Sequence, residues 1–135
     1  MNRRERVAFD LLRPINPSFI IVLGVYTVLW GLWLANPFWT VFTHAALYSA
    51  LSFFPETVIG LVAIAAGLLI MRGAMKPSLK NLKMGTFTGT LFWSFISIAY
   101  FIGDWANTGG ITAGMIAVYS GLTWVNVKVN GHLYD

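Results

Sequence analysis

The 135-residue sequence contains no cysteine and few charged residues. Without cysteine, the chain can form neither a disulfide framework nor a thiolate metal site. Asp, Glu, Lys and Arg together make up only 10% of the residues, whereas 57% are hydrophobic and 16% are aromatic. A soluble domain of this length needs a more polar surface than this composition supplies. The composition therefore excludes an ordinary soluble domain and indicates a protein that lies in a membrane.

Sequence motifs that carry catalysis are absent as well. There is no Gly-x-Ser-x-Gly nucleophile motif and no phosphate-binding glycine-rich loop. The long apolar runs hold no Asp, Glu, Lys or Arg at mid-depth, and such residues are the usual sign of transport or catalysis inside a membrane. We therefore expect no enzymatic activity, no cofactor and no proton-coupled antiport.

Four apolar runs are long enough to cross a bilayer, which takes about 20 helical residues. These runs cover residues 18–35, 57–75, 84–103 and 110–127. A further segment, 38–54, is shorter, more polar and bounded by two prolines, so we expect it to lie in the outer interface or to re-enter the membrane. The predicted fold is a single all-α integral membrane domain, 1–135, with four transmembrane helices.

The basic residues lie in clusters between these runs. They are Arg3, Arg4, Arg6 and Arg13, then Arg72, Lys76, Lys80 and Lys83, and finally Lys128. With four spans, all of them fall on one side of the membrane, as the positive-inside tendency favours, whereas a fifth span over 38–54 would divide them. We therefore expect a cytoplasmic loop at 76–83 and both termini in the cytoplasm, with the bacterial inner membrane as the location. The net charge of +4 then indicates contact with lipid headgroups and no nucleic-acid partner.

Aromatic residues gather where the first apolar run ends and just before the second begins, away from the basic clusters. They include Trp30, Trp33, Phe38, Phe53 and Phe54. Because ring-bearing side chains favour the headgroup zone, we expect them to mark the outer boundary of the membrane.

Small residues recur at helical spacing in three of the runs. They are Gly60, Ala63 and Gly67, then Gly85 and Gly89, and then Gly110, Gly114, Ala117 and Gly121. Helices in a bilayer associate through close packing of small residues and through interhelical hydrogen bonds. We therefore predict that these residues form the helix-packing faces.

A polar stripe runs along the third apolar run. Thr86, Thr90 and Ser94 follow one another at a spacing of four residues, so they share one helix face. The stripe has two interpretations: it lines an aqueous path between several copies, or its hydroxyls bond to carbonyls of their own or a neighbouring helix. The absence of any charged residue in the stripe favours the second interpretation.

Three ionisable residues are weak candidates for a metal site on the outer side: His44, Glu56 and Asp104. Imidazole and carboxylate groups suit divalent cations. The three residues are scattered, however, and none shows a spacing such as His-x-x-x-His. Glu56 also follows a proline at an expected helix start, where a negative charge is favourable. We predict no metal site.

Several segments resemble parts of known small membrane proteins. These segments are the basic start NRRER at 2–6, the proline-punctuated entry RPINPSF at 13–19, and the polar end LTWVNVKVNGH at 122–132. Together with the compact spans, they resemble the small multispan membrane proteins of tailed bacteriophages, some of them holin-like. The resemblance covers size and hydropathy, and it transfers no functional residue.

This resemblance implies a small self-associating inner-membrane protein that perturbs the membrane. Two alternatives stay open: a non-catalytic accessory or scaffold subunit of a larger membrane complex, and a small channel or transporter. The expected partners are the lipid bilayer and either further copies of the chain or other membrane-protein subunits.

Overall fold

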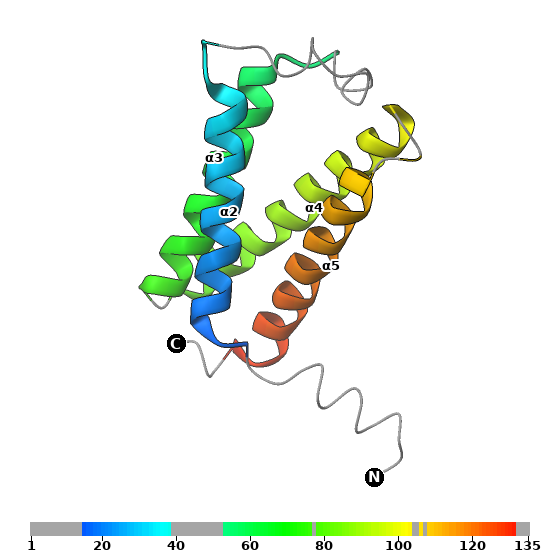
Figure 1. The fold of residues 1–135 in the computed structure, drawn as a ribbon. Coiled ribbons are helices and arrows are strands. Elements are labelled where there is room, and N and C mark those ends of the chain that lie inside the picture. Colours follow the sequence, from blue (N-terminus) through cyan, green and yellow to red (C-terminus); the bar gives the residue numbers. More distant parts are fainter. Residues whose placement is uncertain (1–14, 39–52, 77, 104–105, 107, 132–135) are drawn as a thin grey trace, which may run out of the picture.

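In the described part of the computed structural model, the regular secondary structure is helical, with no strand (Figure 1). It covers residues 15–38, 53–76, 78–103, 106 and 108–131. The helices are α2 (Pro17–Ala35), α3 (Glu56–Met75), α4 (Leu79–Gly103) and α5 (Thr108–Val129). Each of these helices is long and apolar enough to cross a membrane. The prediction of an all-α membrane fold with four transmembrane helices is confirmed.

Local sequence signals explain where α2 begins and ends. The Asn16 Oδ1 accepts a hydrogen bond from the Ser18 backbone N–H at 3.0 Å. Pro17 occupies the first turn, where a backbone N–H would have no partner within the helix, so proline loses no helical hydrogen bond there. At the other end α2 stops at Ala35, because Pro37 disfavours a helical conformation of the residue before it.

The turn between α3 and α4 is shorter than the sequence predicts. A loop is expected over 76–83, whereas α4 already begins at Leu79. The Ser78 carbonyl accepts a hydrogen bond from the Leu82 backbone N–H at 3.0 Å, which closes the first helical turn. Lys80 and Lys83 are compatible with the first turns of α4, because lysine is a good helix former. The helix therefore begins before the apolar run that was predicted as the third span, and the start of the span in the membrane stays a prediction.

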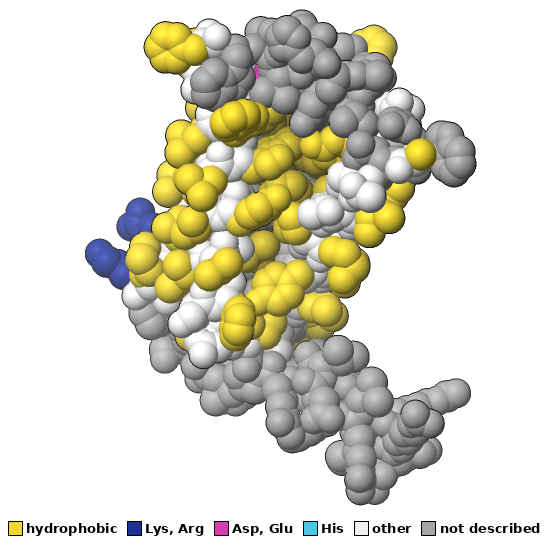
Figure 2. Space-filling model, viewed as in Figure 1, with side chains coloured by type: hydrophobic (Ala, Val, Ile, Leu, Met, Phe, Trp, Pro, Cys, Tyr) yellow, Lys and Arg dark blue, Asp and Glu magenta, His cyan; other side chains and the backbone are white. Residues whose placement is uncertain are grey.

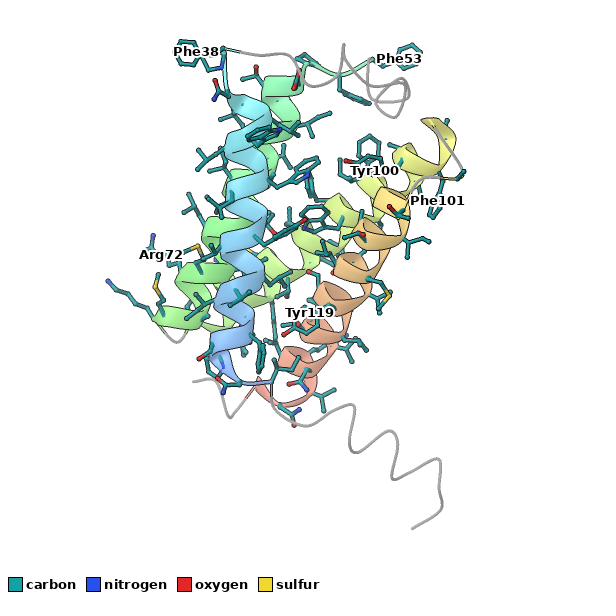
Figure 3. The ribbon with its side chains drawn as sticks, in the orientation of Figure 1. Phe38, Phe53, Arg72, Tyr100, Phe101 and Tyr119 are labelled. Carbon is teal, nitrogen blue, oxygen red and sulfur yellow. The ribbon has the colours of Figure 1, made fainter. Side chains whose placement is uncertain are left out.

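The segment 38–54, expected at the outer interface or as a re-entrant hairpin, lies largely outside the described residues. Phe38 and Phe53 are described, and they lie at the end of the bundle where α2 stops and α3 begins (Figure 3). Their side chains are 88% and 89% exposed. The choice between an interfacial and a re-entrant segment stays a prediction.

The helices are arranged as two antiparallel hairpins. Helix α2 packs along α3, and α4 packs along α5, while α3 contacts α4 and so joins the hairpins. Figure 1 shows the α2–α3 pair upright beside a tilted α4–α5 pair. Helices α2 and α5 touch at few positions. Three of the four seams between neighbouring helices are therefore closed, and the fourth is largely open.

Two pairs of glycines bring the backbones of α2 and α3 into contact. A Cβ on Gly67 would lie only 2.6 Å from the Gly24 carbonyl oxygen, and a Cβ on Gly60 only 2.7 Å from the Gly31 carbonyl oxygen. Ordinary van der Waals contacts of a Cβ are 3.4–4 Å long. In each helix the two glycines are seven residues apart, a spacing that keeps them on one face of a left-handed helix pair. Only glycine allows this close crossing.

Two clusters of buried apolar side chains form the core. The cluster nearer the start of α3 contains Leu34, Ile59, Ala63, Phe92, Trp93, Ile96, Ala99, Ala113 and Ala117. The cluster at the opposite end contains Ile20, Leu23, Ile70, Leu82 and Val127. Each cluster draws on all four helices, so close packing along the whole bundle holds the hairpins together.

Candidate functional site

A buried hydrogen bond joins α2 to α4. The Trp93 Nε1 donates to the Thr27 Oγ1 at 3.1 Å, and the Thr27 hydroxyl donates in turn to the Leu23 carbonyl at 2.8 Å. Trp93 is 2% exposed and Thr27 is fully buried. An indole N–H without a partner is costly in such an interior. The bond therefore fixes how the second hairpin sits against the first.

An aromatic cluster surrounds this bond. The Trp93 ring centroid lies 5.5 Å from that of Tyr26, 5.2 Å from that of Trp30 and 5.4 Å from that of Phe92. Such tilted and edge-on contacts are the favourable geometries for aromatic pairs. Trp30 was expected at the membrane boundary, but its ring packs against the core. The ring contact with Trp93 does not fix the depth of Trp30 in the membrane, so its place at the boundary stays a prediction.

The polar stripe on α4 is used inside the chain. The hydroxyls of Thr86 and Thr90 donate to the carbonyls of Leu82 and Thr86, each at 2.7 Å. The Ser120 hydroxyl on α5 donates to the Thr86 carbonyl at 2.9 Å. Thr86 is fully buried, whereas Ser94 is partly exposed. Two of the three stripe residues, Thr86 and Thr90, thus bond to their own helix, and α5 packs over the stripe at Thr86.

The small residues predicted as packing faces lie where helices meet. They are Gly60, Ala63 and Gly67 on α3, Gly85 and Gly89 on α4, and Gly110, Gly114, Ala117 and Gly121 on α5. A Cβ on Gly85 would lie 2.6 Å from the Ile70 backbone nitrogen of α3, and one on Gly89 would lie 2.9 Å from the Ser120 Oγ of α5. The contact at Gly121 is looser, since its Cβ would lie 3.4 Å from Thr90 Cγ2.

The sequence interpretation missed the glycines of α2 and a serine of α4. Gly24 and Gly31 are both buried, and they oppose the predicted glycines of α3. Their spacing of seven residues is the signal that indicates a packing face. Ser97 donates its hydroxyl to the Gly110 carbonyl at 2.7 Å and so ties α4 to α5. No periodic pattern in the sequence singles out this serine.

An apolar groove lies in the open seam between α2 and α5. Its volume is about 430 Å³, which falls within the usual range of about 300–1,000 Å³ for ligand sites. It is lined by Phe19, Val22, Leu23 and Tyr26 of α2 and by Thr112, Met115, Ile116 and Tyr119 of α5 (Figure 3 labels Tyr119). Figure 2 shows hydrophobic side chains spread over this face of the molecule. The groove opens sideways, so in a membrane it would face the hydrocarbon.

A smaller pocket continues the groove toward the aromatic cluster. Its volume is about 170 Å³, and it shares Tyr26, Thr112 and Ile116 with the groove. Trp30 and Tyr100 form part of its wall. The Thr112 hydroxyl already donates to the Thr108 carbonyl at 3.1 Å. The pocket is therefore an extension of the groove with a mixed polar and aromatic lining, and no Asp, Glu, His, Lys or Arg is among its described lining residues.

The described basic residues lie at one end of the bundle. They are Arg72 and Lys76 at the end of α3, Lys80 and Lys83 at the start of α4, and Lys128 near the end of α5. Lys128 lies over the Trp124 ring, with its Nζ 5.3 Å from the ring centroid. Glu56, the first residue of α3, lies at the opposite end. The described charges are thus divided between the two ends of the bundle.

Of the three weak metal candidates, His44 and Asp104 lie outside the described residues. Glu56 occupies the first turn of α3, at the positive end of the helix dipole. Within the part of the chain that the structure describes, no three His, Asp or Glu residues come together.

Comparisons of the chain with family models, with curated proteins and with solved structures found no match.

Proposed function

We propose that this chain is a small, non-catalytic membrane protein that acts by associating with further copies of itself. The observation that supports the proposal is the open seam between α2 and α5. The other three seams are closed by close backbone approach and by buried hydrogen bonds. Because α2 and α5 hardly touch, no other described segment of the chain fills their apolar groove. A membrane helix gains packing by closing such a seam.

A second copy of the chain fits this groove because the groove and its rim lie on the same face. Phe19, Val22 and Met115 are 62%, 63% and 64% exposed, so they project beside the hollow they line. A two-fold contact lets one patch serve both partners, with the rim of each copy placed in the groove of the other. The resemblance to holin-like phage membrane proteins favours the same type of assembly and a role in perturbing the membrane.

The arrangement of α4 argues against a pore lined by the polar stripe. The hydroxyls of Thr86 and Thr90 donate hydrogen bonds to carbonyls of their own helix, and α5 packs over the stripe at Thr86. A channel through the stripe would require α5 to move away from α4. In the alternative of an accessory subunit, a helix of another membrane protein would fill the same groove. The two hypotheses differ only in which chain supplies that helix.

The described charges support one orientation in the bacterial inner membrane. Five bases lie at one end of the bundle, and Glu56 lies at the other. Since basic ends of membrane helices favour the cytoplasm, we assign the start of α2 and the end of α5, and with them both termini, to that side.

Cysteine cross-linking tests the proposed contact directly, because the natural chain has no cysteine to interfere. Single cysteines replace groove residues in Val22→Cys and Met115→Cys, and they replace exposed residues on other helices in the controls Leu68→Cys and Leu91→Cys. The full chains are reconstituted in bilayers at high lipid dilution and treated with a mild oxidant. We expect covalent dimers from the groove variants and few from the controls.

Mass determination in mild detergent, corrected for bound detergent, completes this test. A defined oligomer of one chain agrees with the proposal. Equal cross-linking at all four positions would indicate random collision, and a monomer in every condition would also refute self-association. Co-purification of a different membrane protein, lost on Met115→Trp, would instead support the accessory-subunit alternative.

A further inference from the structure

Four bases converge where α3 ends and α4 begins. Arg72 comes from the last turn of α3, Lys76 caps the end of that helix, and Lys80 and Lys83 come from α4. A Cβ on Gly73 would lie 2.6 Å from the Leu82 backbone nitrogen, so the two helix ends touch backbone to backbone. This contact sits beside Arg72 in one helix and beside Lys83 in the other. We call these four bases the basic corner; Figures 2 and 3 show basic side chains, with Arg72 labelled, projecting at this edge.

The basic corner has no acidic neighbour in the described part of the chain. Glu56 is the acidic residue described there, and it lies at the opposite end of α3. Arg72, Lys76 and Lys80 are exposed, and Lys83 is partly exposed. Among the described residues, none of the four bases forms an ion pair. The described part of the chain therefore supplies no counter-charge to the basic corner.

Helix stability does not explain the two lysines of α4. The first turn of a helix favours negative charge, yet the first turn of α4 contains no acid and carries Lys80. A flexible loop does not explain them either, because both lysines are already helical and Leu82 between them is buried in the core. A charge that merely orients the chain needs no such fixed position. The arrangement holds several cations at the membrane surface in a rigid frame.

The geometry points to the basic corner as a binding site for the phosphate headgroup of an anionic phospholipid. The ends of membrane-spanning helices lie at the depth of lipid phosphates, and clusters of Lys and Arg there attract anionic lipids. The site uses charge complementarity, with bases from two helices around one headgroup. It depends on membrane insertion of the chain but not on self-association, since the basic corner belongs to the α3–α4 turn and the groove lies between α2 and α5.

Native mass spectrometry of the full chain, released from a neutral detergent, tests this site by counting bound lipids during a titration. The probes are phosphatidylglycerol and phosphatidylcholine with identical acyl chains. Each base near a membrane surface contributes about 1 kcal/mol to anionic-lipid binding, equivalent to about fivefold in affinity. We expect Lys80→Gln/Lys83→Gln to weaken phosphatidylglycerol binding by about 30-fold. Lys128→Gln, which removes a base from α5 at the same end, should change it by less than about fivefold.

A charge-preserving variant separates the ligand contact from folding. Lys80→Arg/Lys83→Arg should bind phosphatidylglycerol about as well as the natural chain. The assignment is overturned if both lipids bind equally, if the Gln variant binds normally, or if Lys128→Gln loses as much affinity as the double variant. Complete displacement of the lipid by millimolar inorganic phosphate would identify a free-anion site and would also overturn the lipid assignment. Each of these results can be obtained with a monomer, so failure of self-association is detected separately.

Discussion

Replacement of Gly67 by alanine tests the close crossing of α2 and α3. The new Cβ would lie 2.6 Å from the Gly24 carbonyl oxygen, 2.6 Å from Val28 Cγ2 and 2.9 Å from the Val28 backbone nitrogen. Two of these three atoms belong to the backbone, so a side-chain rotation cannot relieve the contact. Because the shortest ordinary contact is 3.4 Å, α2 would have to move away by about 0.8 Å. Such a shift loosens the crossing over several turns.

The expected loss combines two opposing effects. Overpacking of a close contact costs about 1–3 kcal/mol, and the higher helix propensity of alanine returns up to about 1 kcal/mol. Taking the middle of the overpacking range, about 2 kcal/mol, less up to about 1 kcal/mol for propensity, we expect Gly67→Ala to lower the free energy of unfolding by about 1–2 kcal/mol. Gly121→Ala is the matched control, because its Cβ would lie 3.4 Å from Thr90 Cγ2 and meets no backbone atom. The control should keep the natural stability or gain about 0.5–1 kcal/mol.

The two variants are compared by equilibrium unfolding in mixed micelles, with sodium dodecyl sulfate as the denaturant and helicity or tryptophan fluorescence as the signal. The reasoning predicts a lower midpoint for Gly67→Ala alone. It is refuted if Gly67→Ala unfolds at the natural midpoint, or if Gly121→Ala is destabilised by the same amount, because backbone contact would then not distinguish the two sites.

Three further predictions concern single contacts. Thr27 and Trp93 share one buried hydrogen bond, so a double-mutant cycle of unfolding with Thr27→Val and Trp93→Phe should show coupling. The expected coupling energy is about 0.6 kcal/mol and no more than about 1.7 kcal/mol. Zero coupling would contradict the bond. Thr90→Val should leave the permeability of liposomes that contain the protein unchanged, since the Thr90 hydroxyl is bonded to the Thr86 carbonyl, and a changed dye or ion flux would restore the channel alternative. Gly73→Ala should separate the ends of α3 and α4, and we expect faster tryptic cleavage after Lys80 than in the natural chain, because the bond after Lys76 precedes Pro77 and resists trypsin. Equal cleavage rates would show that the turn tolerates a side chain.

The overall fold could be predicted because its signal is strong and local. Long apolar runs and a lack of charge indicate membrane helices, and the clustered bases favour four crossings over five. The start of α4 was harder to place, because its first turn is polar and the helix there is set by backbone hydrogen bonds beginning at Ser78. Helix limits therefore follow capping and propensity, whereas hydropathy reports only the part inside the hydrocarbon.

The contacts between helices could be predicted only in part. The small residues of α3, α4 and α5 do lie at helix contacts, but the partner of each face depends on the arrangement of the hairpins. Gly24 and Gly31 show a heptad spacing that was available in the sequence. The bond between Thr27 and Trp93 joins residues 66 positions apart, and no local pattern contains that information. The open seam between α2 and α5 likewise exists only in three dimensions.

The near absence of contact between α2 and α5 has a consequence for biogenesis. Nearly all close packing joins helices that are neighbours in the sequence, so little depends on the last helix meeting the first. A chain with such local contacts can fold in the order in which it is made. The glycine crossing of α2 and α3 can form as soon as both helices have entered the membrane, before α4 is complete. The first hairpin then serves as a preassembled surface on which the second hairpin docks through Trp93.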